Sequence, residues 1–152
     1  MTIGINRSPS TLTSRYGKST LECNGARIRA HCRHLATVVT IHGDIGPANA
    51  DRVSNYVRRF VFANNPLVID LSGVTSFAAE AVSLCHAVDE ACRAAGLEWT
   101  LVASRPVAER LRDHDDKAVF PMARSAHEAL RQFADAIARR REVMLPLIRK
   151  SA

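Results

Sequence analysis

Several histidine and aspartate residues of this chain are candidate metal ligands, because of their types and their spacing. His31, His34 and His42 lie close together in the sequence, and His114 belongs to the run 113–116, whose other members are aspartates. The alternation of the three histidines and the neighbouring arginines are typical of a solvated strand face. The run 113–116 lacks the glycine and the spaced ligands of a calcium loop, so we interpret it as a solvated turn. The sequence therefore predicts no metal site.

No arrangement of residues that would support catalysis can be identified. Catalysis would require a nucleophile with a base, paired carboxylates or a metal cluster around one pocket. The sequence has neither a P-loop nor a dinucleotide-binding glycine motif, so strong nucleotide binding is not predicted. Weak phosphate binding at the amino end of the helix that Ala78 opens stays an alternative, although Glu80 would oppose it. We expect a protein without enzymatic activity or cofactor.

The cysteines indicate a reducing compartment. Neither a CxxC pair nor a zinc-like cysteine and histidine spacing occurs. Cys85 and Cys92 would lie about 10 Å apart along one helix face, too far for a disulfide, and we expect them to be small buried hydrophobic residues. No signal peptide is found, and no apolar run reaches the roughly 20 residues of a membrane helix. These observations favour the cytoplasm.

The positive charge of the chain is concentrated near the ends of its sequence. The formal charge is +6 over 152 residues, of which residues 1–34 carry a net +5 and residues 139–152 a net +4, leaving −3 for the remainder. A nucleic-acid-binding protein needs a basic face on its folded body, with aromatic or groove-reading elements. We therefore do not expect nucleic acid as a partner.

Residues 65–96 are predicted to form the central unit of the fold, in the order strand, loop and helix. The run 66–71 is apolar without alternation, which indicates a strand covered on both faces, as in a central parallel strand. Residues 72–77 are expected to turn the chain, and Ala78 opens a helix with one apolar stripe. Gly96 follows this stripe, where a left-handed cap usually falls. In an open α/β sheet the functional residues lie at such strand-to-helix loops.

Before this unit, alternating apolar residues predict a strand pair over 26–30 and 35–42, with a turn near Arg33 and His34. Pro47 suits the first position of the helix that follows. That helix has its core face at Val53, Tyr56, Val57, Phe60 and Val61.

After this unit, a strand begins at Leu97 and alternates, which predicts that only one of its faces is covered. A short helix follows Ser104, and Pro121 confines an edge strand at 118–122 to the margin of the sheet. Ser125 and Glu128 form a capping box for the last helix, whose inner face would hold Ala129, Leu130, Phe133 and Ile137. The fold class predicted is α/β, with a mixed sheet, central parallel strands and about four helices.

The chain is expected to comprise three parts, a disordered tail, a folded domain and an extension. Residues 1–20 have no apolar period and are predicted to be a disordered basic tail rich in Ser and Thr, residues 21–138 the domain, and residues 139–152 a basic extension. Kinase sites in the tail, at Ser8, Ser10, Thr11 and Ser14, are an alternative to a merely solvated segment.

Three segments together resemble the STAS domain, a family of bacterial anti-sigma factor antagonists and of the cytoplasmic domains of sulfate transporters. They read HGDIGPANADRV, LVIDLSGVTSF and AGLEWTLVASRPVAERL, and the resemblance covers about residues 26–137. The resemblance implies a STAS-like fold and a protein partner. By the same resemblance, that partner is expected to be an anti-sigma factor that is itself a serine kinase.

The loop of this chain departs from the phosphorylated loop of that family. The family loop usually reads as an aspartate, two small hydroxyl or glycine residues and a glycine, and the hydroxyl after the aspartate accepts the phosphate. The matching positions here are Ala78, Ala79, Glu80 and Ala81, so the phosphoacceptor position, Ala79, has no hydroxyl. Gly46 is a second departure, since the family commonly has an aspartate there. The resemblance therefore predicts a binding module without the usual phosphoserine switch.

Glu80 and the nearby hydroxyls each have two interpretations. Glu80 places about one negative charge where a phosphoserine would place roughly 1.5 to 2. It could mimic the phosphorylated state, or simply be favoured in a first helical turn by the macrodipole. Thr75, Ser76 and Ser83 could be substitute phosphoacceptors, or bond locally near the helix start.

The sequence thus predicts a non-catalytic regulatory module of the cytoplasm. By resemblance, its partner-binding residues would be Gly43, Asp44, Thr75, Ser76, Ala79, Glu80 and Ser83. The alternatives are an accessory subunit of a membrane transporter, whose basic tails would lie against anionic lipid, and a sensor of a small ligand or nucleotide. A homodimer stays possible.

Overall fold

The computed structural model describes residues 19–33, 36–61, 65–113 and 119–151. The predicted tail kinase sites, His34, and residues 114–116 of the predicted solvated turn lie outside these ranges. Within them, no helix has both the length and the apolar character needed to cross a membrane.

The fold is α/β, as predicted, with one mixed sheet. Its strands are β1 (Ser19–Cys23), β2 (Ala26–Arg33), β3 (Ala36–Ile45), β4 (Leu67–Phe77), β5 (Trp99–Ala103) and β6 (Met122–Ala123), and they lie side by side in chain order. The β1–β2 and β2–β3 pairs are antiparallel, whereas the β3–β4, β4–β5 and β5–β6 pairs are parallel. The described helices are α2 (Ala50–Arg58), the short 3₁₀ helix η2 (Ala79–Ala81), α3 (Val82–Ala95), α4 (Arg105–Asp113) and α5 (Ala126–Ser151).

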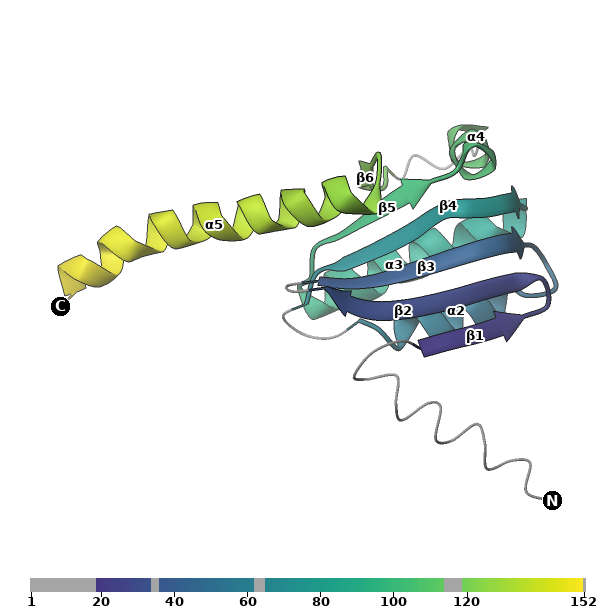
Figure 1. The fold of residues 1–152 in the computed structure, drawn as a ribbon, viewed down its shortest axis with the longest axis horizontal. Coiled ribbons are helices and arrows are strands. Elements are labelled where there is room, and N and C mark those ends of the chain that lie inside the picture. Colours follow the sequence, from purple (N-terminus) through teal and green to yellow (C-terminus); the bar gives the residue numbers. More distant parts are fainter. Residues whose placement is uncertain (1–18, 34–35, 62–64, 114–118, 152) are drawn as a thin grey trace, which may run out of the picture.

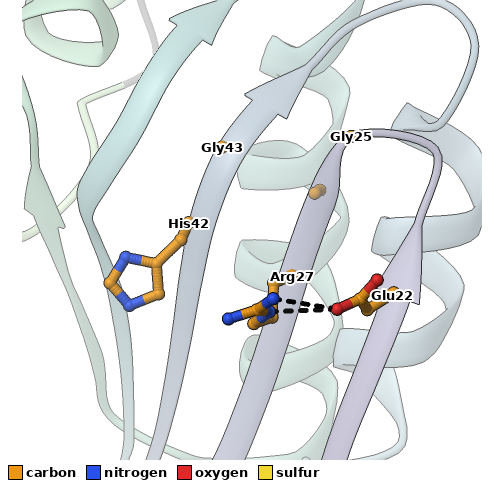
Figure 2. A pocket seen from close by; sticks show the side chains of 6 residues that line it. Glu22, Gly25, Arg27, His42 and Gly43 are labelled. Carbon is orange, nitrogen blue, oxygen red and sulfur yellow. Dashed lines mark hydrogen bonds and ion pairs between the residues drawn. The ribbon is translucent and has the colours of Figure 1, made fainter.

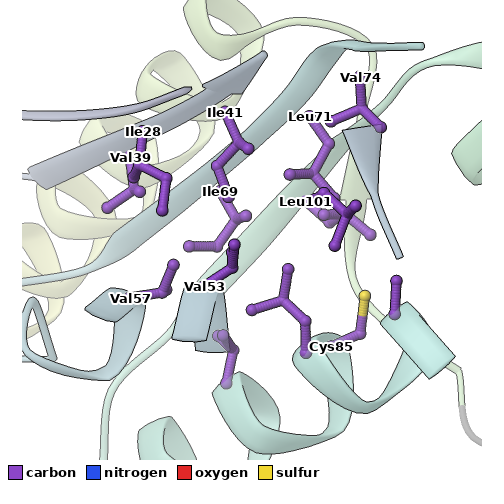
Figure 3. Packing of buried hydrophobic residues seen from close by; sticks show 14 of the residues in the cluster. Ile28, Val39, Ile41, Val53, Val57, Ile69, Leu71, Val74, Cys85 and Leu101 are labelled. Atoms are coloured by element: carbon purple, nitrogen blue, oxygen red, sulfur yellow. The ribbon is translucent and has the colours of Figure 1, made fainter. Parts of the chain in front are cut away.

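Helices α2 and α3 cover one face of the sheet and form the main core with it (Figure 1). Figure 3 shows how side chains from β2 to β5 meet those of the two helices. The largest fully buried members include Ile28, Ile41, Ile69, Leu71, Leu101, Val53 and Val57. Burial of each such side chain contributes about 1.5–3 kcal/mol to stability, so this layer holds the helices against the sheet.

Helix α5 covers only part of the opposite face. Its Ala129 and Phe133 pack on Val68, Val102 and the start of β3, and the rest of the helix extends away from the sheet (Figure 1). Over β1, β2 and the carboxyl half of β3, Figure 1 shows no helix on this side. We call this uncovered part of the sheet the open face.

The caps predicted from the sequence are confirmed. Gly96 ends α3 in the left-handed region, with φ 71° and ψ 30°. The Ser125 hydroxyl accepts a bond from the Glu128 amide at 3.1 Å, and the Glu128 carboxylate accepts one from the Arg124 amide at 2.9 Å.

The turn predicted at residues 72–77 is wrong, because β4 continues as a strand to Phe77. Its pairing with β3 extends to Ile45 and Phe77 by way of two register shifts, at which the ladder is locally disrupted and then resumes. Ser72, Thr75 and Ser76 are exposed in this part of β4, and polar exposed residues in a strand read as loop from sequence alone.

Strand β1 was not predicted. It forms a hairpin with β2 through Asn24 and Gly25, which have φ 42° and 101° and make the tight Asn-Gly turn of antiparallel strands. The sequence boundary expected at residues 20 and 21 falls inside β1, and the one expected at residues 138 and 139 falls inside α5.

Three predicted element limits and the predicted covering of β5 are wrong. Helix α2 begins at Ala50 and not at Pro47, β5 begins at Trp99 and not at Leu97, and β6 comprises Met122–Ala123 and not residues 118–122. Strand β5 is covered on both faces, since Thr100 and Val102 are buried along with Trp99 and Leu101. The second cover is α5, whose packing could not be foreseen from the pattern of β5 alone.

Candidate partner-binding surface

The residues that the sequence proposed for partner binding lie together at one end of the sheet. Asp44 pairs with Ser76 and Gly43 with Val74 in the β3–β4 ladder, and the Ala78 amide donates to the Ile45 carbonyl at 2.9 Å. Helix η2 and the start of α3 follow directly, so Ala79, Glu80 and Ser83 belong to the same edge. This edge is the carboxyl end of two parallel strands, where α/β proteins usually bind their partners.

This set, which we call the loop surface, comprises Gly43, Asp44, Thr75, Ser76, Ala79, Glu80 and Ser83. All of its members are exposed except Gly43, which is half-buried. The surface is thus accessible to a macromolecule.

Two hydroxyls of the loop surface are engaged in local hydrogen bonds. The Thr75 hydroxyl donates to the Asp44 carboxylate at 2.8 Å, across the β3–β4 pair. The Ser83 hydroxyl donates to the Glu80 carbonyl at 2.8 Å, within the first turn of the helix. Transfer of a phosphoryl group to either oxygen would break the bond that its proton makes.

Ala79 is the first residue of η2, and its methyl group is exposed. Ala78 before it is extended, with φ −78° and ψ 166°, and makes no side-chain cap bond. Glu80 is the acidic residue of this first turn, where the helix dipole favours a carboxylate. The start of η2 therefore presents a methyl group and a carboxylate in place of hydroxyls.

Arg110 supports the loop surface from α4. Its Nε donates to the Phe77 carbonyl at 3.1 Å, two residues before Ala79. The sequence analysis did not single out Arg110, because the bond joins residues that are 33 positions apart. Only the fold brings them together.

Asn49 is a second supporting residue that the sequence analysis missed. Its side chain is buried, with 2% exposure, and its Nδ2 lies 2.9 Å from the Cys23 carbonyl, 3.1 Å from that of Asn24 and 2.9 Å from that of Asp44. Its Oδ1 accepts from the Gly46 amide at 2.9 Å. Asn49 thus ties the β1–β2 hairpin to the end of β3. A polar residue just before a helix is the signal by which the sequence could have identified it.

Gly46 and Ala78, both departures from the family pattern, are neighbours in space. A side-chain carbon built on Gly46 would lie 3.9 Å from the Ala78 Cβ, which is an ordinary contact distance. The two positions at which the sequence resemblance would place carboxylates thus lie beside each other next to the loop surface.

The buried cysteines are not nucleophiles. Burial raises the pKa of the Cys85 thiol from 9.0 to about 12. Burial, and then the negative charge of Asp89, raise the pKa of Cys92 to about 11. Both thiols stay protonated at neutral pH, and the prediction that these two residues are buried is confirmed. Cys32, in contrast, is exposed. Among the described side chains, no three His, Cys, Asp or Glu residues converge as metal ligands.

Comparison with known proteins places the chain in a family. The STAS domain family matches residues 27–129, and the chain belongs to this family, as the sequence resemblance indicated. A Mycobacterium tuberculosis protein named osmosensory protein A is 48% identical to this chain over 155 residues, with 99% of this chain and 98% of that protein covered.

A solved structure has the same fold. The crystal structure of an anti-sigma factor antagonist from Mycobacterium paratuberculosis superposes with a TM-score of 0.59, over 72% of this chain and 94% of that one. The sequence identity is 21%, so this likeness concerns the fold alone.

Proposed function

We propose that this protein is a non-catalytic regulatory module that binds a protein partner through the loop surface and is not switched by phosphorylation at position 79. The observation that carries the proposal is the exposed Ala79 methyl group at the start of η2. A STAS domain that is switched at this position needs an acceptor oxygen there, and a methyl group supplies none.

The support of the loop surface agrees with a binding role. Thr75 bonds Asp44, Arg110 bonds the Phe77 carbonyl, and Asn49 holds the Asp44 carbonyl. A surface that is held in one conformation loses less entropy when a partner binds.

The proposed partner is an anti-sigma factor or a related serine kinase, in the cytoplasm. The relative named osmosensory protein A supports a role in the response to osmotic stress. Glu80 supplies a fixed negative charge of about one at the surface, against roughly 1.5 to 2 for a phosphoserine. We propose that this charge mimics the phosphorylated state.

The test is affinity purification of the tagged full chain from its native cells, before and after an osmotic shock. Ala79→Arg would place a long cation on the loop surface and is expected to remove the partner. Arg58→Ala on the exposed side of α2 is the matched control and should keep it. Recovery of the same partners at the same yield with Ala79→Arg would contradict the proposal. Glu80→Ser is expected to change partner affinity, and unchanged affinity would dismiss the mimicry alone.

A further inference from the structure

Three arginines form a row along β2 on the open face. Arg27, Arg29 and Arg33 are exposed, and the half-buried His31 stands between Arg29 and Arg33, while the alternate residues Ala26, Ile28 and Ala30 are buried in the core. Side chains two residues apart on a strand project from the same face, about 6.6–6.8 Å from each other. We call these three residues the arginine row.

The sequence analysis assigned these charges to a basic end of the chain, and the structure corrects this. The arginine row lies within the folded sheet, on its second strand. Basic charge is therefore present on a face of the domain body, which the count by sequence segments concealed.

The strands beside the row offset little of its charge. Glu22 is opposite Arg27 on β1. The Glu22 Oε2 accepts hydrogen bonds from the Arg27 Nε at 3.2 Å and from the Arg27 Nη2 at 3.0 Å. Arg29 is flanked by Thr20 and Thr40. Among the described residues, neither Arg29 nor Arg33 has a carboxylate within ion-pair distance. Two of the three guanidinium charges thus face solvent without a counter-charge.

The row ends in a hollow of about 300 Å³, lined by Glu22, Gly25, Ala26, Arg27, His42 and Gly43. In Figure 2 the His42 ring points away from Arg27, toward β4. There it lies over Gly73, its partner in the ladder, where a side-chain carbon would collide with the imidazole. Because glycines have no side chains, the surface at this end of the open face lies close to the backbone.

We propose that the arginine row binds an acidic segment of a partner protein in an extended conformation. Every second residue of such a segment projects from one face, so its carboxylates can lie opposite Arg27 and Arg29, two residues apart, and opposite Arg33, four residues further along the strand. Bidentate pairing with carboxylates is the interaction that guanidinium groups make best.

Two other polyanions fit the face less well. Single-stranded nucleic acid usually stacks its bases on aromatic side chains, and the described side chains in and beside the row offer only the imidazoles of His31 and His42. A membrane-binding surface usually adds exposed apolar side chains that enter the lipid, whereas the apolar neighbours of the row, Ala36 and Val38, are buried. The inference goes beyond the proposed function, because it concerns other charged residues and a different ligand chemistry, although Gly43 belongs both to the loop surface and to the lining of the hollow.

The test uses a fluorescein-labelled peptide of alternating Glu and Ala, about 12 residues long to span the row. Its polarisation is measured with the full chain at low salt and at about 1 M NaCl, where the Debye length is about 3 Å. We expect saturable binding at low salt that is lost at high salt. The double variant Arg29→Glu, Arg33→Glu should weaken binding at least about tenfold.

The matched control reverses two charges on the other layer, in Arg52→Glu, Arg58→Glu on α2, and should bind like the wild type. Ala79→Arg should also bind the peptide, so failure of the proposed function would not affect this result. Equal loss in both double variants, or no saturable binding by a folded wild type, would overturn the inference. Tighter binding of an oligo-dT strand or of phosphatidylglycerol vesicles, lost in the row variant, would overturn the assignment to an acidic protein.

Discussion

The Thr75 hydroxyl donates a 2.8 Å hydrogen bond to the Asp44 carboxylate, and this bond joins β4 to β3 where the strand register shifts. A shifted ladder has fewer evenly spaced backbone bonds, so a side-chain bond at that place limits the motion of the strand ends. Both residues are exposed, which means that water competes for the bond. Its effect should therefore be local and not global.

Thr75→Val keeps the shape of the side chain and removes the donor. We expect a loss of unfolding free energy of at most about 1 kcal/mol, together with faster hydrogen exchange at residues 74–77. Urea unfolding and amide exchange measured by NMR check the two parts. Ser72→Ala, on the same exposed side of β4, is the control and should leave exchange at residues 74–77 unchanged.

Asn49→Ala should be among the most destabilising polar substitutions in this chain. It would leave the buried Cys23 carbonyl and the Asp44 carbonyl without their side-chain donor, at a cost of about 2–3 kcal/mol. Asn55→Ala, on the exposed side of α2, is the control and should change the unfolding free energy by less than about 0.5 kcal/mol. Equal midpoints for the two variants in urea would show that the bonds of Asn49 contribute little.

Sequence patterns predicted the parts of this fold that depend on neighbouring residues. The helix stripe before Gly96 and the capping box at Ser125 and Glu128 are local, and both are present. The exposed end of β4 was misread because Ser72 and Thr75 are polar for a reason that lies outside the strand, which is the absence of a covering helix.

The support of the loop surface was missed for a similar reason. Arg110 and Asn49 act on backbone carbonyls that are 33 and 26 residues away, and no local pattern encodes such a contact. The members of the loop surface itself were predicted from resemblance, and the fold brings them to one edge.

Two glycines on neighbouring strands should respond differently to the same substitution. Gly43 has φ +99°, and a side-chain carbon there would collide with the Gly25 carbonyl oxygen, so both the backbone and its neighbour oppose Gly43→Ala. We expect a loss of about 2 kcal/mol or more. Gly73→Ala would meet only the His42 ring, which is exposed and free to change rotamer, so its loss should stay near or below about 1 kcal/mol.

Measuring both Gly→Ala substitutions in the His42→Ala background identifies which neighbour causes each loss of stability. In the double variant His42→Ala, Gly73→Ala, the cost of Gly73→Ala should largely disappear, whereas His42→Ala should not relieve Gly43→Ala. Thermal unfolding of the three single variants, the two double variants and the wild type measures both coupling energies. Relief of Gly43→Ala by His42→Ala would contradict the assigned collision with the Gly25 oxygen.

The buried thiols predict a loss of stability at alkaline pH. Because burial raises the pKa of Cys85 from 9.0 to about 12, the unfolded chain releases this proton first as the pH rises. The contribution of the buried, protonated Cys85 thiol to the unfolding free energy is fully present below about pH 9 and is lost between about pH 9 and pH 12. Unfolding free energies over this range should fall less steeply for Cys85→Ala than for the wild type.

Alkylation distinguishes the cysteines at neutral pH. Iodoacetamide should modify the exposed Cys32 in the native protein, and Cys23, Cys85 and Cys92 only after unfolding. Peptide mass spectrometry before and after addition of urea reads out each site. Native modification of Cys85 at the rate of Cys32 would show that the core around it opens.

Ala79→Ser tests whether one missing oxygen accounts for the loss of the family switch. Incubated with ATP and the kinase recovered as its partner, this variant should gain one phosphate at position 79, whereas the wild type should gain none there. Ala78→Ser is the matched control, since its hydroxyl stands one residue earlier, at the extended cap position of η2. That hydroxyl can accept a bond from a helix amide, so Ala78→Ser should raise the melting temperature without taking up phosphate. Phosphate on the wild type between residues 75 and 83, found by peptide mass spectrometry, would instead mean that Thr75, Ser76 or Ser83 has replaced the missing acceptor.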